Sequence, residues 1–188
     1  MLSRMRTILR RTFFDAYKAY KQRRAVLTRD HALSVARQMV EHATYCFLIT
    51  HGQDGWPSAR LVQPIADAAD PFTLWIGTNP ALRKVREIDA TPKATVAIED
   101  TRQGANLVLY GMARPVDDPD ACSTYWQDAW RMFFPDGPSS DGFVLLRFEA
   151  ARMELMSFGR NVVAEPFGLR PLRLVREGDW RLDDVAET

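Results

Sequence analysis

The sequence predicts a mainly β protein of the α+β class, in which an antiparallel β-barrel is flanked by a few helices. Three observations lead to this fold class. Short runs of apolar and β-branched residues recur through the middle of the chain, turns that contain Gly and Asp join most of them as hairpins, and few helical segments interrupt them. The sequence contains neither of the Gly-rich nucleotide-binding patterns that occur on doubly wound sheets.

The chain begins with a basic segment. Residues 1–24 hold eight Arg or Lys and one acid, whereas the whole chain has a formal net charge of +1, which gives no general attraction to nucleic acid. We expect a basic helical extension over residues 1–27 that either touches a membrane surface or packs on a partner subunit, and we favour the packing. Asp15 and the aromatic run "FFDAYKAY" argue against a mitochondrial transit peptide.

The remaining residues, 28–188, are expected to form a single domain. No apolar run approaches 18 residues and the basic start lacks the apolar core of a secretory signal, so we expect a cytoplasmic protein without a transmembrane segment. Cys46 and Cys122 lie in apolar stretches, where we expect buried, reduced thiols rather than a disulfide.

The first half of this domain is predicted to contain one helix and three strands. Apolar residues at helical spacing predict a helix over residues 28–43, with Thr28 or Asp30 as its cap. After this helix, the spacing of the apolar residues changes from that of a helix to that of strands. Strands are predicted over residues 44–50, 56–65 and 72–78, and the turn "HGQDG" joins the first two as a hairpin.

The second half alternates helices and hairpins. A short helix is predicted over residues 80–89, with Asn79 as its cap and Pro80 at its first position. Strands follow over residues 93–100 and 106–116. One helix over residues 118–134 is predicted from the shared face of Cys122, Trp126, Ala129, Trp130 and Phe133, and a long strand over 143–156 and a closing hairpin over 169–184 complete the chain.

No residues stand out as a metal site or an acid–base pair. His31, His42 and His51 lack the spacing of metal ligands, and Ser34 and Ser157 lack the surroundings of a nucleophile. We therefore predict no metal site and no hydrolase, and the sequence identifies no catalytic residue.

A candidate anion site lies in "WIGTNPALRKVREI". The start of the predicted helix presents free N–H groups, Gly77 lets a ligand approach the backbone, and Thr78, Arg83 and Lys84 add a hydroxyl and two cations. Arg60, on the strand before it, lies among apolar residues and supplies a third cation if it faces this loop. Together these groups suit a phosphate monoester.

A structural explanation of the same residues stays open at this stage. Arg83 and Lys84 could form the solvated face of a short helix, and Arg60 could pair with Glu99 or Asp100 across the sheet. Side-chain alternation on a strand places Arg60 and Val62 on one face, and Leu61 and Gln63 on the other.

Four segments occur in an order and spacing that resemble a known family: "RLVQPI" at 60–65, "WIGTNPALRKV" at 75–85, "ATPKATVAIED" at 90–100 and "NLVLYGMARPV" at 106–116. They are similar to the flavin-binding split-barrel family typified by pyridoxamine 5′-phosphate oxidase. Residues 125–137, "YWQDAWRMFFPDG", resemble its general stress protein branch. The resemblance covers residues 40–157 and implies a six-stranded antiparallel split barrel and a homodimer. It also implies one FMN in each of two clefts between the subunits, with FAD as an alternative.

The resemblance also assigns roles by position. Arg60 and Lys84 would hold the FMN phosphate, with Thr78 and Arg83 assisting, and the backbone at Leu61, Val62, Gln63, Ile76 and Gly77 would run beside the flavin. Asn106 stands where the oxidase has a glutamine that contacts flavin. Trp126 and Trp130 either cover the flavin from the other subunit or pack into the core.

Two departures from the family pattern bear on the reaction. Ile65 stands where vitamin B6 oxidases have a lysine that grips the substrate phosphate, and their C-terminal Arg and His motif has no clear counterpart in "FGRNVVAEPFGLRPLRLV". We expect an FMN-dependent oxidoreductase that acts on another small molecule, with a nicotinamide nucleotide or oxygen as the second partner. The alternatives are a flavin-binding stress protein with little turnover, and a split barrel that binds haem or a deazaflavin.

Overall fold

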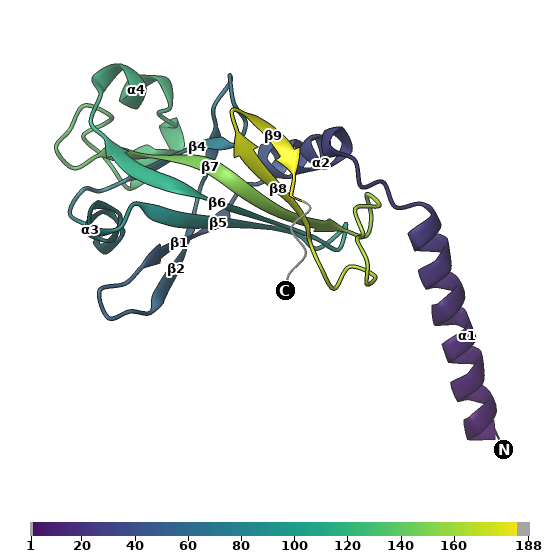
Figure 1. Cartoon of the computed structure of the whole chain (residues 1–188). Coiled ribbons are helices and arrows are strands. Elements are labelled where there is room, and N and C mark those ends of the chain that lie inside the picture. Colours follow the sequence, from purple (N-terminus) through teal and green to yellow (C-terminus); the bar gives the residue numbers. More distant parts are fainter. Residues whose placement is uncertain (1, 184–188) are drawn as a thin grey trace.

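The computed structural model describes residues 2–183, of which residues 2–10 are described as backbone only (Figure 1). Four α-helices and one 3-10 helix are present in this part of the chain: α1 (Leu2–Arg23), α2 (Arg29–His42), α3 (Arg83–Ala90), α4 (Pro119–Thr124) and η1 (Asp128–Met132). The strands are β1 (Cys46–His51), β2 (Pro57–Val62), β3 (Ile65–Ala66), β4 (Thr73–Thr78), β5 (Lys93–Asp100), β6 (Ala105–Val116), β7 (Val144–Ser157), β8 (Leu172–Glu177) and β9 (Asp179–Leu182). The fold is therefore a mostly antiparallel sheet with a few helices, as predicted.

A short link joins the two edge strands of the curled sheet. Its hydrogen-bonded order is β2-β1-β5-β6-β7-β4-β3, and β8 extends from β7 and carries β9. The two ends of this order, β2 and β3, are consecutive in the chain and are separated only by Gln63 and Pro64. The strand predicted over residues 56–65 was therefore wrong as a single strand, because its first part pairs with β1 and its second with β4.

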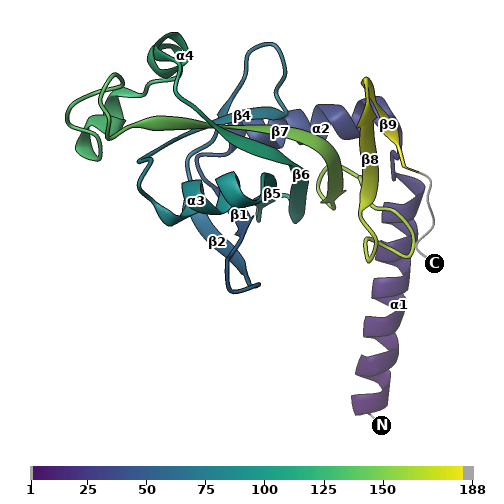
Figure 2. The same ribbon diagram turned by 60° about the vertical axis from the view of Figure 1, so that its left-hand side comes forward.

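The long pair β6 and β7 forms the spine of the sheet (Figures 1 and 2). Its register shifts between Tyr110 and Gly111, where Ala151 is the extra residue of a β-bulge. A Cβ atom at Gly111 would lie 2.0 Å from the carbonyl oxygen of Glu149, so only glycine fits this close approach.

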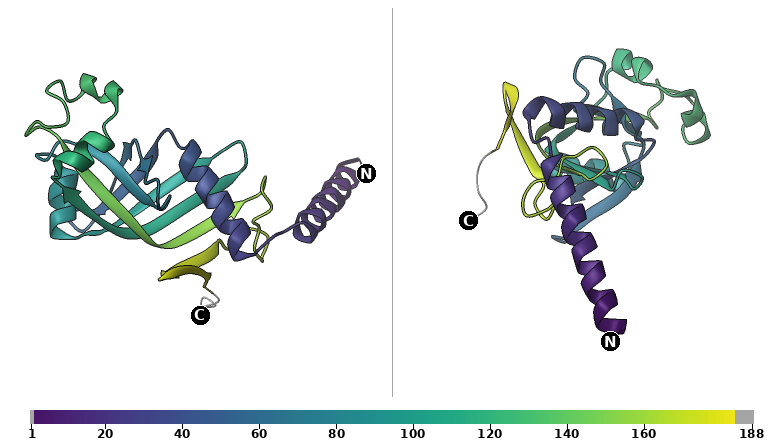
Figure 3. Two further views of the ribbon diagram at one scale, coloured as in Figure 1. Left: turned by 90° about the horizontal axis from the view of Figure 1, so that it is seen from above. Right: turned by 90° about the vertical axis from the view of Figure 1, so that its right-hand side faces the viewer.

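The main hydrophobic core lies inside the curled sheet. Leu48, Val96 and Leu109 are cross-strand partners on β1, β5 and β6, and all three are fully buried. Helix α2 lies across the sheet (Figure 3) and packs Val35, Met39 and other apolar residues into this core. The hydroxyl of Thr28 accepts a hydrogen bond from the backbone N–H of His31, which confirms Thr28 as the helix cap.

Helix α1 stands away from the body of the molecule (Figures 1 and 2). Its C-terminal part is attached to the body, where Lys21 Nζ donates to the carbonyl oxygen of Phe158 at 2.7 Å and the Tyr17 and Phe167 rings meet edge to face. Within residues 2–183, no helix combines the length and the apolar character that crossing a bilayer requires.

Two predicted helices differ from the structure. The helix predicted from residue 80 begins at Arg83, because the carbonyl side-chain oxygen of Asn79 accepts from the N–H of Ala81 and closes a separate turn before the helix. The helix predicted over residues 118–134 is broken into α4 and η1, with Tyr125, Trp126 and Gln127 between them. The predicted apolar face is buried only in part, since Cys122 and Trp130 are buried but Phe133 is exposed.

Candidate functional site

The predicted cations meet where β2 and β4 approach helix α3. Arg60 lies on β2 on the same face as buried Val62, as strand alternation predicts, and Thr78 is the last residue of β4. Lys84 lies in the first turn of α3 and donates from Nζ to Thr78 Oγ1 at 2.8 Å. The charge of Arg60 acts on Lys84, so the two cations lie within electrostatic reach of each other.

Glu87 is the centre of this cluster, and its carboxylate is only 2% exposed. Its Oε2 accepts from Arg60 Nη2 at 2.6 Å and from Thr50 Oγ1 at 2.5 Å, while its Oε1 lies 3.2 Å from Arg83 Nε. Burial raises the pKa of Glu87, but the hydrogen bonds from Thr50, Arg60 and Ser58 outweigh it, so the pKa lies below its ordinary value. The carboxylate therefore stays ionised and holds the Arg60 guanidinium in place.

This contact settles the partner of Arg60. The pairing considered with Glu99 or Asp100 was wrong, because Arg60 binds Glu87, and it also donates to Thr50 and to the carbonyl oxygen of Leu48. Neither Glu87 nor Thr50 was predicted to belong to the site. The spacing of Arg83 and Glu87, four residues apart on a helix, was the one available signal.

Lys84 is held in an unfavourable electrostatic environment. Burial, and then the nearby charge of Arg60, lower the pKa of Lys84 below its ordinary value. Its Nζ donates a hydrogen bond to the neutral hydroxyl of Thr78. Arg60, Arg83 and Lys84 carry three positive charges around the single negative charge of Glu87, which leaves an excess of about two charges, the charge that a phosphate monoester carries near neutral pH.

The other predicted residues divide between two further surfaces. Leu61 and Asn106 lie on the outer face of the sheet, because the inward row at this level consists of Arg60, Leu48, Val96 and Leu109. Asn106 pairs with Glu99 and Met156 across neighbouring strands. Within this chain, the sheet therefore separates Asn106 from the cation cluster.

Gly77 leaves room for an aromatic ring of the same chain. A Cβ atom at Gly77 would lie 2.5 Å from Cζ3 of Trp130, and Trp130 Nε1 donates to Gln63 Oε1 at 2.9 Å. Trp130 is buried in a second apolar cluster with Trp75, and Trp126 packs edge to face against it with ring centroids 6.0 Å apart. The two tryptophans thus pack within the same chain, while the buried Trp126 Nε1 has no hydrogen-bond partner among the described residues.

Asp67 ties this aromatic cluster to the sheet edge. Its Oδ2 accepts from Tyr125 Oη at 2.6 Å and from Trp75 Nε1 at 3.0 Å, and the two rings stack with centroids 4.4 Å apart. The hydrogen bond from Tyr125, and then that from Trp75, lower the pKa of Asp67 to about 2. The carboxylate is ionised throughout the neutral range.

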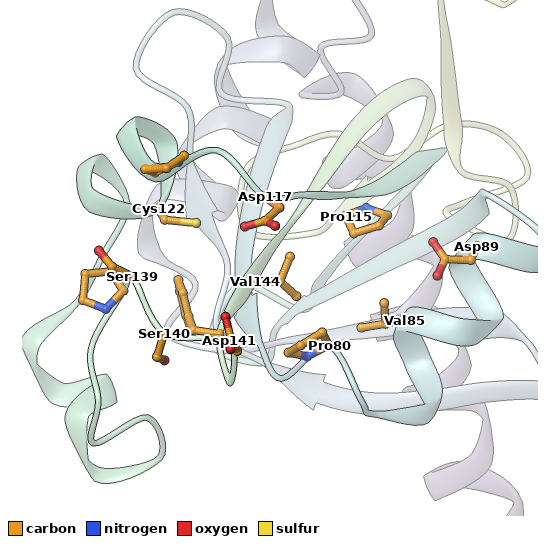
Figure 4. Close-up of a pocket in the computed structure, with 13 residues that line it drawn as sticks. Pro80, Val85, Asp89, Pro115, Asp117, Cys122, Ser139, Ser140, Asp141 and Val144 are labelled. Carbon is orange, nitrogen blue, oxygen red and sulfur yellow. The ribbon is translucent and has the colours of Figure 1, made fainter.

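A separate cavity of about 460 Å³ lies on the other side of α3, between that helix, α4 and the loop before β7 (Figure 4). Asp89, Asp117 and Asp141 line it, together with Cys122 and several prolines and serines. Because its charged groups are acidic, this cavity does not suit a phosphate. Cys46 and Cys122 are both buried free thiols, as predicted, and the described residues contain no cluster of metal-ligating side chains.

Comparisons with known proteins bear on the family and the fold of the chain. A sequence model described as pyridoxamine 5′-phosphate oxidase matches residues 33–157, more than half of the chain. No functionally curated protein gives a significant match.

Solved structures show the same fold at low sequence identity. A Clostridium acetobutylicum protein related to general stress protein 26 is 21% identical with a TM-score of 0.61, and the match covers 68% of this chain and 89% of that one. General stress protein 26 from Bacillus anthracis is 14% identical with a TM-score of 0.57, covering 65% and 92% of the two chains. A Nostoc punctiforme protein named as pyridoxamine 5′-phosphate oxidase-related and FMN-binding is 18% identical with a TM-score of 0.63, covering 83% and 95%. The curled antiparallel sheet and the match over residues 33–157 show that the chain belongs to the pyridoxamine 5′-phosphate oxidase family.

Proposed function

We propose that this protein binds FMN and works as a flavin-dependent oxidoreductase on a small molecule. One observation supports the proposal most strongly: Arg60 and Arg83 pair with a single buried carboxylate and Lys84 binds a neutral hydroxyl, so the cluster has about two positive charges left for a ligand. Membership of a family whose Nostoc relative is named FMN-binding supports the same ligand.

The phosphate of FMN fits the cluster chemically. Lys84 is half-buried beside another cation, and a dianion would remove the electrostatic cost of that position. Arg60 is only 18% exposed and is already oriented by Glu87, so little side-chain freedom is lost when it binds a phosphate. In this proposal Thr78 assists through its hydroxyl, and the exposed Arg83 adds long-range attraction.

The flavin ring would then lie near the junction of β2 and β3. The backbone at Leu61, Val62 and Gln63 runs from the cation cluster to this junction, and the Trp130 indole already covers Gly77 there. The ring therefore shares this surface with Trp130 instead of occupying the space over Gly77. The buried, unpaired N–H of Trp126 lies in the same aromatic cluster and is free to donate to an acceptor.

A homodimer completes the proposal. The outer face of the sheet carries the exposed side chains of Phe47 and Leu61, which are direct cross-strand neighbours, and the partly buried Val108 follows in the same row. Asn106 lies on this outer face, where a residue of one subunit can reach the flavin of the other. We place the dimer in the cytoplasm, with one FMN at each of two equivalent sites between the subunits.

Bound FMN supplies the redox chemistry, by accepting or donating a hydride. The chain's own residues bind the phosphate, orient the ring and limit its contact with water. Ile65 pairs with Trp75 and presents an apolar side chain, so it cannot hold a substrate phosphate by charge. We therefore propose a substrate other than pyridoxine phosphate, with a nicotinamide nucleotide or oxygen as the second partner.

Titration of the purified protein with FMN and with riboflavin tests the binding proposal. FMN should bind more tightly than riboflavin, and Arg60→Ala and Lys84→Ala should each weaken FMN binding by about 1–3 kcal/mol. Equal affinity for the two flavins would contradict the phosphate site.

The reaction is tested on the FMN-loaded protein by anaerobic addition of NADH or NADPH and then of oxygen. Bleaching of the flavin absorption, followed by its return, supports an oxidoreductase. A protein that binds FMN but is not reduced would instead be a flavin carrier. A Soret band in the purified protein would point to haem.

A further inference from the structure

Helix α1 exposes an unusual number of aromatic rings. Phe13, Phe14, Tyr17 and Tyr20 are all exposed within eight residues. Phe13, Tyr17 and Tyr20 are spaced at i, i+4 and i+7, so they share one face of the helix. In the sequence, the apolar residues Leu2, Met5, Ile8 and Leu9 precede them at helical spacing. An isolated helix with such a face gains stability only by burying it.

The charge of the same helix narrows the choice of partner. Residues 1–24 carry eight Arg or Lys and one acid. Pairing α1 with its copy in another subunit would bring two strongly positive helices together, which is electrostatically unfavourable. An anionic surface, in contrast, would neutralise these charges. A nucleic acid would accept the basic residues but would leave the apolar stripe unburied, whereas a lipid surface takes both.

The body of the protein extends this surface. Between α1 and the loop before β8 lies a shallow, mostly apolar cleft of about 450 Å³, lined by Phe14, Tyr17, Phe158 and Phe167 and by the charged residues Asp15 and Lys18. Lys18 lies on its rim, with Nζ 5.7 Å from the centre of the Phe167 ring. The cleft thus combines an apolar floor with the ammonium group of Lys18, which suit the acyl chains and the phosphate of an anionic lipid. Asp15 also lines the cleft, but it is the one acid against eight Arg or Lys in residues 1–24.

The attachment of α1 leaves the remainder of the helix accessible. Lys21 and Gln22 bond to Phe158 and Glu165, so the C-terminal end of α1 is fixed on the loop. The preceding turns project away from the sheet and from the cation cluster at α3 in all views (Figures 1–3). A flat surface can therefore meet α1 without covering the proposed flavin site.

We propose that α1, together with the cleft at Phe158 and Phe167, binds the surface of membranes that contain anionic lipids. The helix lies on the surface with its aromatic face among the lipid headgroups and its Arg and Lys side chains next to the lipid phosphates. The β-sheet domain remains in the aqueous phase. This inference replaces the partner-subunit packing that the sequence favoured, and it does not depend on flavin binding.

Vesicle flotation of the full-length protein tests the proposal. One set of vesicles contains phosphatidylcholine alone, and the other contains phosphatidylcholine with about one third phosphatidylserine. The wild-type protein should float with the anionic vesicles at least about tenfold more than with the neutral ones, and 0.5 M NaCl should release it, because salt screens the attraction.

Two matched double variants separate the helix from general surface effects. Phe13→Glu with Phe14→Glu changes side chains that are 67% and 62% exposed, and Met132→Glu with Phe133→Glu changes side chains that are 79% and 68% exposed at the opposite end of the molecule. Both remove two exposed apolar groups and add two negative charges. The first should reduce flotation by at least about tenfold, and the second should leave it within about twofold of wild type.

Each remaining outcome would overturn the proposal. Equal flotation of the two double variants, no flotation of the wild-type protein, or equal binding to neutral and anionic vesicles would do so. Sedimentation analysis should give the same oligomeric state for wild type and for the Phe13 and Phe14 double variant. A change of oligomeric state would instead make α1 a subunit contact. Salt-sensitive binding of wild type to a duplex of unrelated sequence, in place of vesicles, would make it a nucleic-acid contact.

Discussion

Replacing Lys84 by Met should weaken FMN binding while leaving the apo protein at least as stable. The ammonium of Lys84 is half-buried, contacts the neutral hydroxyl of Thr78 and lies near the charge of Arg60. Its lowered pKa means that the folded protein holds this charge less readily than the unfolded chain does. Methionine has a similar length and no charge, so it removes the unfavourable electrostatic contribution without opening a large cavity.

The expected magnitude follows from the contact with phosphate. A hydrogen bond between charged groups contributes about 1.5–3 kcal/mol, and each 1.4 kcal/mol changes an equilibrium constant tenfold. The Kd for FMN should therefore rise by about 10- to 150-fold. Riboflavin has no phosphate, so its Kd should change by less than about threefold. The free energy of unfolding of the apo protein should stay equal to that of wild type or rise above it.

Flavin fluorescence titration and urea denaturation of the apo protein measure the two quantities separately. Lys93→Met is the matched control, since Lys93 is exposed at the start of β5 and should leave both values unchanged. An unchanged FMN affinity in Lys84→Met would refute the assignment of the phosphate site. A loss of stability in the apo protein would refute the electrostatic argument, even if FMN binding also fell.

Three further predictions concern the aromatic cluster around Trp130 and Trp75 and the dependence of stability and FMN binding on pH. Gly77→Ala should lower the free energy of unfolding by about 1–3 kcal/mol, because the new methyl group would overlap the Trp130 ring. Asp67→Ala should lower it by about 1–3 kcal/mol at pH 7, because Tyr125 Oη loses its acceptor. Since the pKa of Asp67 is lowered to about 2, its carboxylate stabilises the folded protein fully above pH of about 4. The difference in the free energy of unfolding between wild type and Asp67→Ala should therefore shrink as the pH falls toward 2. FMN affinity should fall as the pH rises through the lowered pKa of Lys84, at a lower pH than an ordinary lysine would give.

Each of these predictions has its own control. Gly142→Ala should be nearly neutral, because its new Cβ would have no contact nearer than 3.8 Å, and equal effects at Gly77 and Gly142 would contradict the Trp130 overlap. A stability difference for Asp67→Ala that does not change between pH 4 and pH 2 would show that its carboxylate charge is irrelevant. Lys84→Arg should move the loss of FMN affinity to higher pH, and an unmoved profile would assign the titration to another group.

Strand-level patterns in the sequence predicted most of the sheet. Hairpin turns and strand alternation located the strands and put Arg60 and Val62 on one face. The break between β2 and β3 was missed because "RLVQPI" is uniformly strand-like. Only Pro64, which cannot donate a backbone hydrogen bond, marks the corner.

The sequence rules for where a helix starts failed where a side chain forms a turn of its own in place of the helix. Asn79 and Pro80 form a good helix-start pattern, but the Asn79 side chain closes its own turn and delays α3 to Arg83. The interaction of Arg60 with Glu87 joins residues 27 positions apart, so spacing along the chain could not reveal it. The same is true of Trp130, whose position over Gly77 depends on how η1 folds back on β4.

The two-residue link between β2 and β3 forms a corner, at which the chain passes from one edge of the sheet to the other. Arg60, which anchors the cation cluster, and Gln63, which holds the Trp130 indole, lie on a run of four residues leading into it. Any insertion at Gln63 or Pro64 would move both groups relative to each other and pull the sheet edges apart. The hairpin tip at Asp54 and Gly55 lies at the other end of β2 and forms neither of these two contacts, although Asp54 lines a small pocket with Arg83 and Glu87, so added residues there would leave the link between β2 and β3 unchanged. Length variation is thus tolerated at one end of β2 and forbidden at the other.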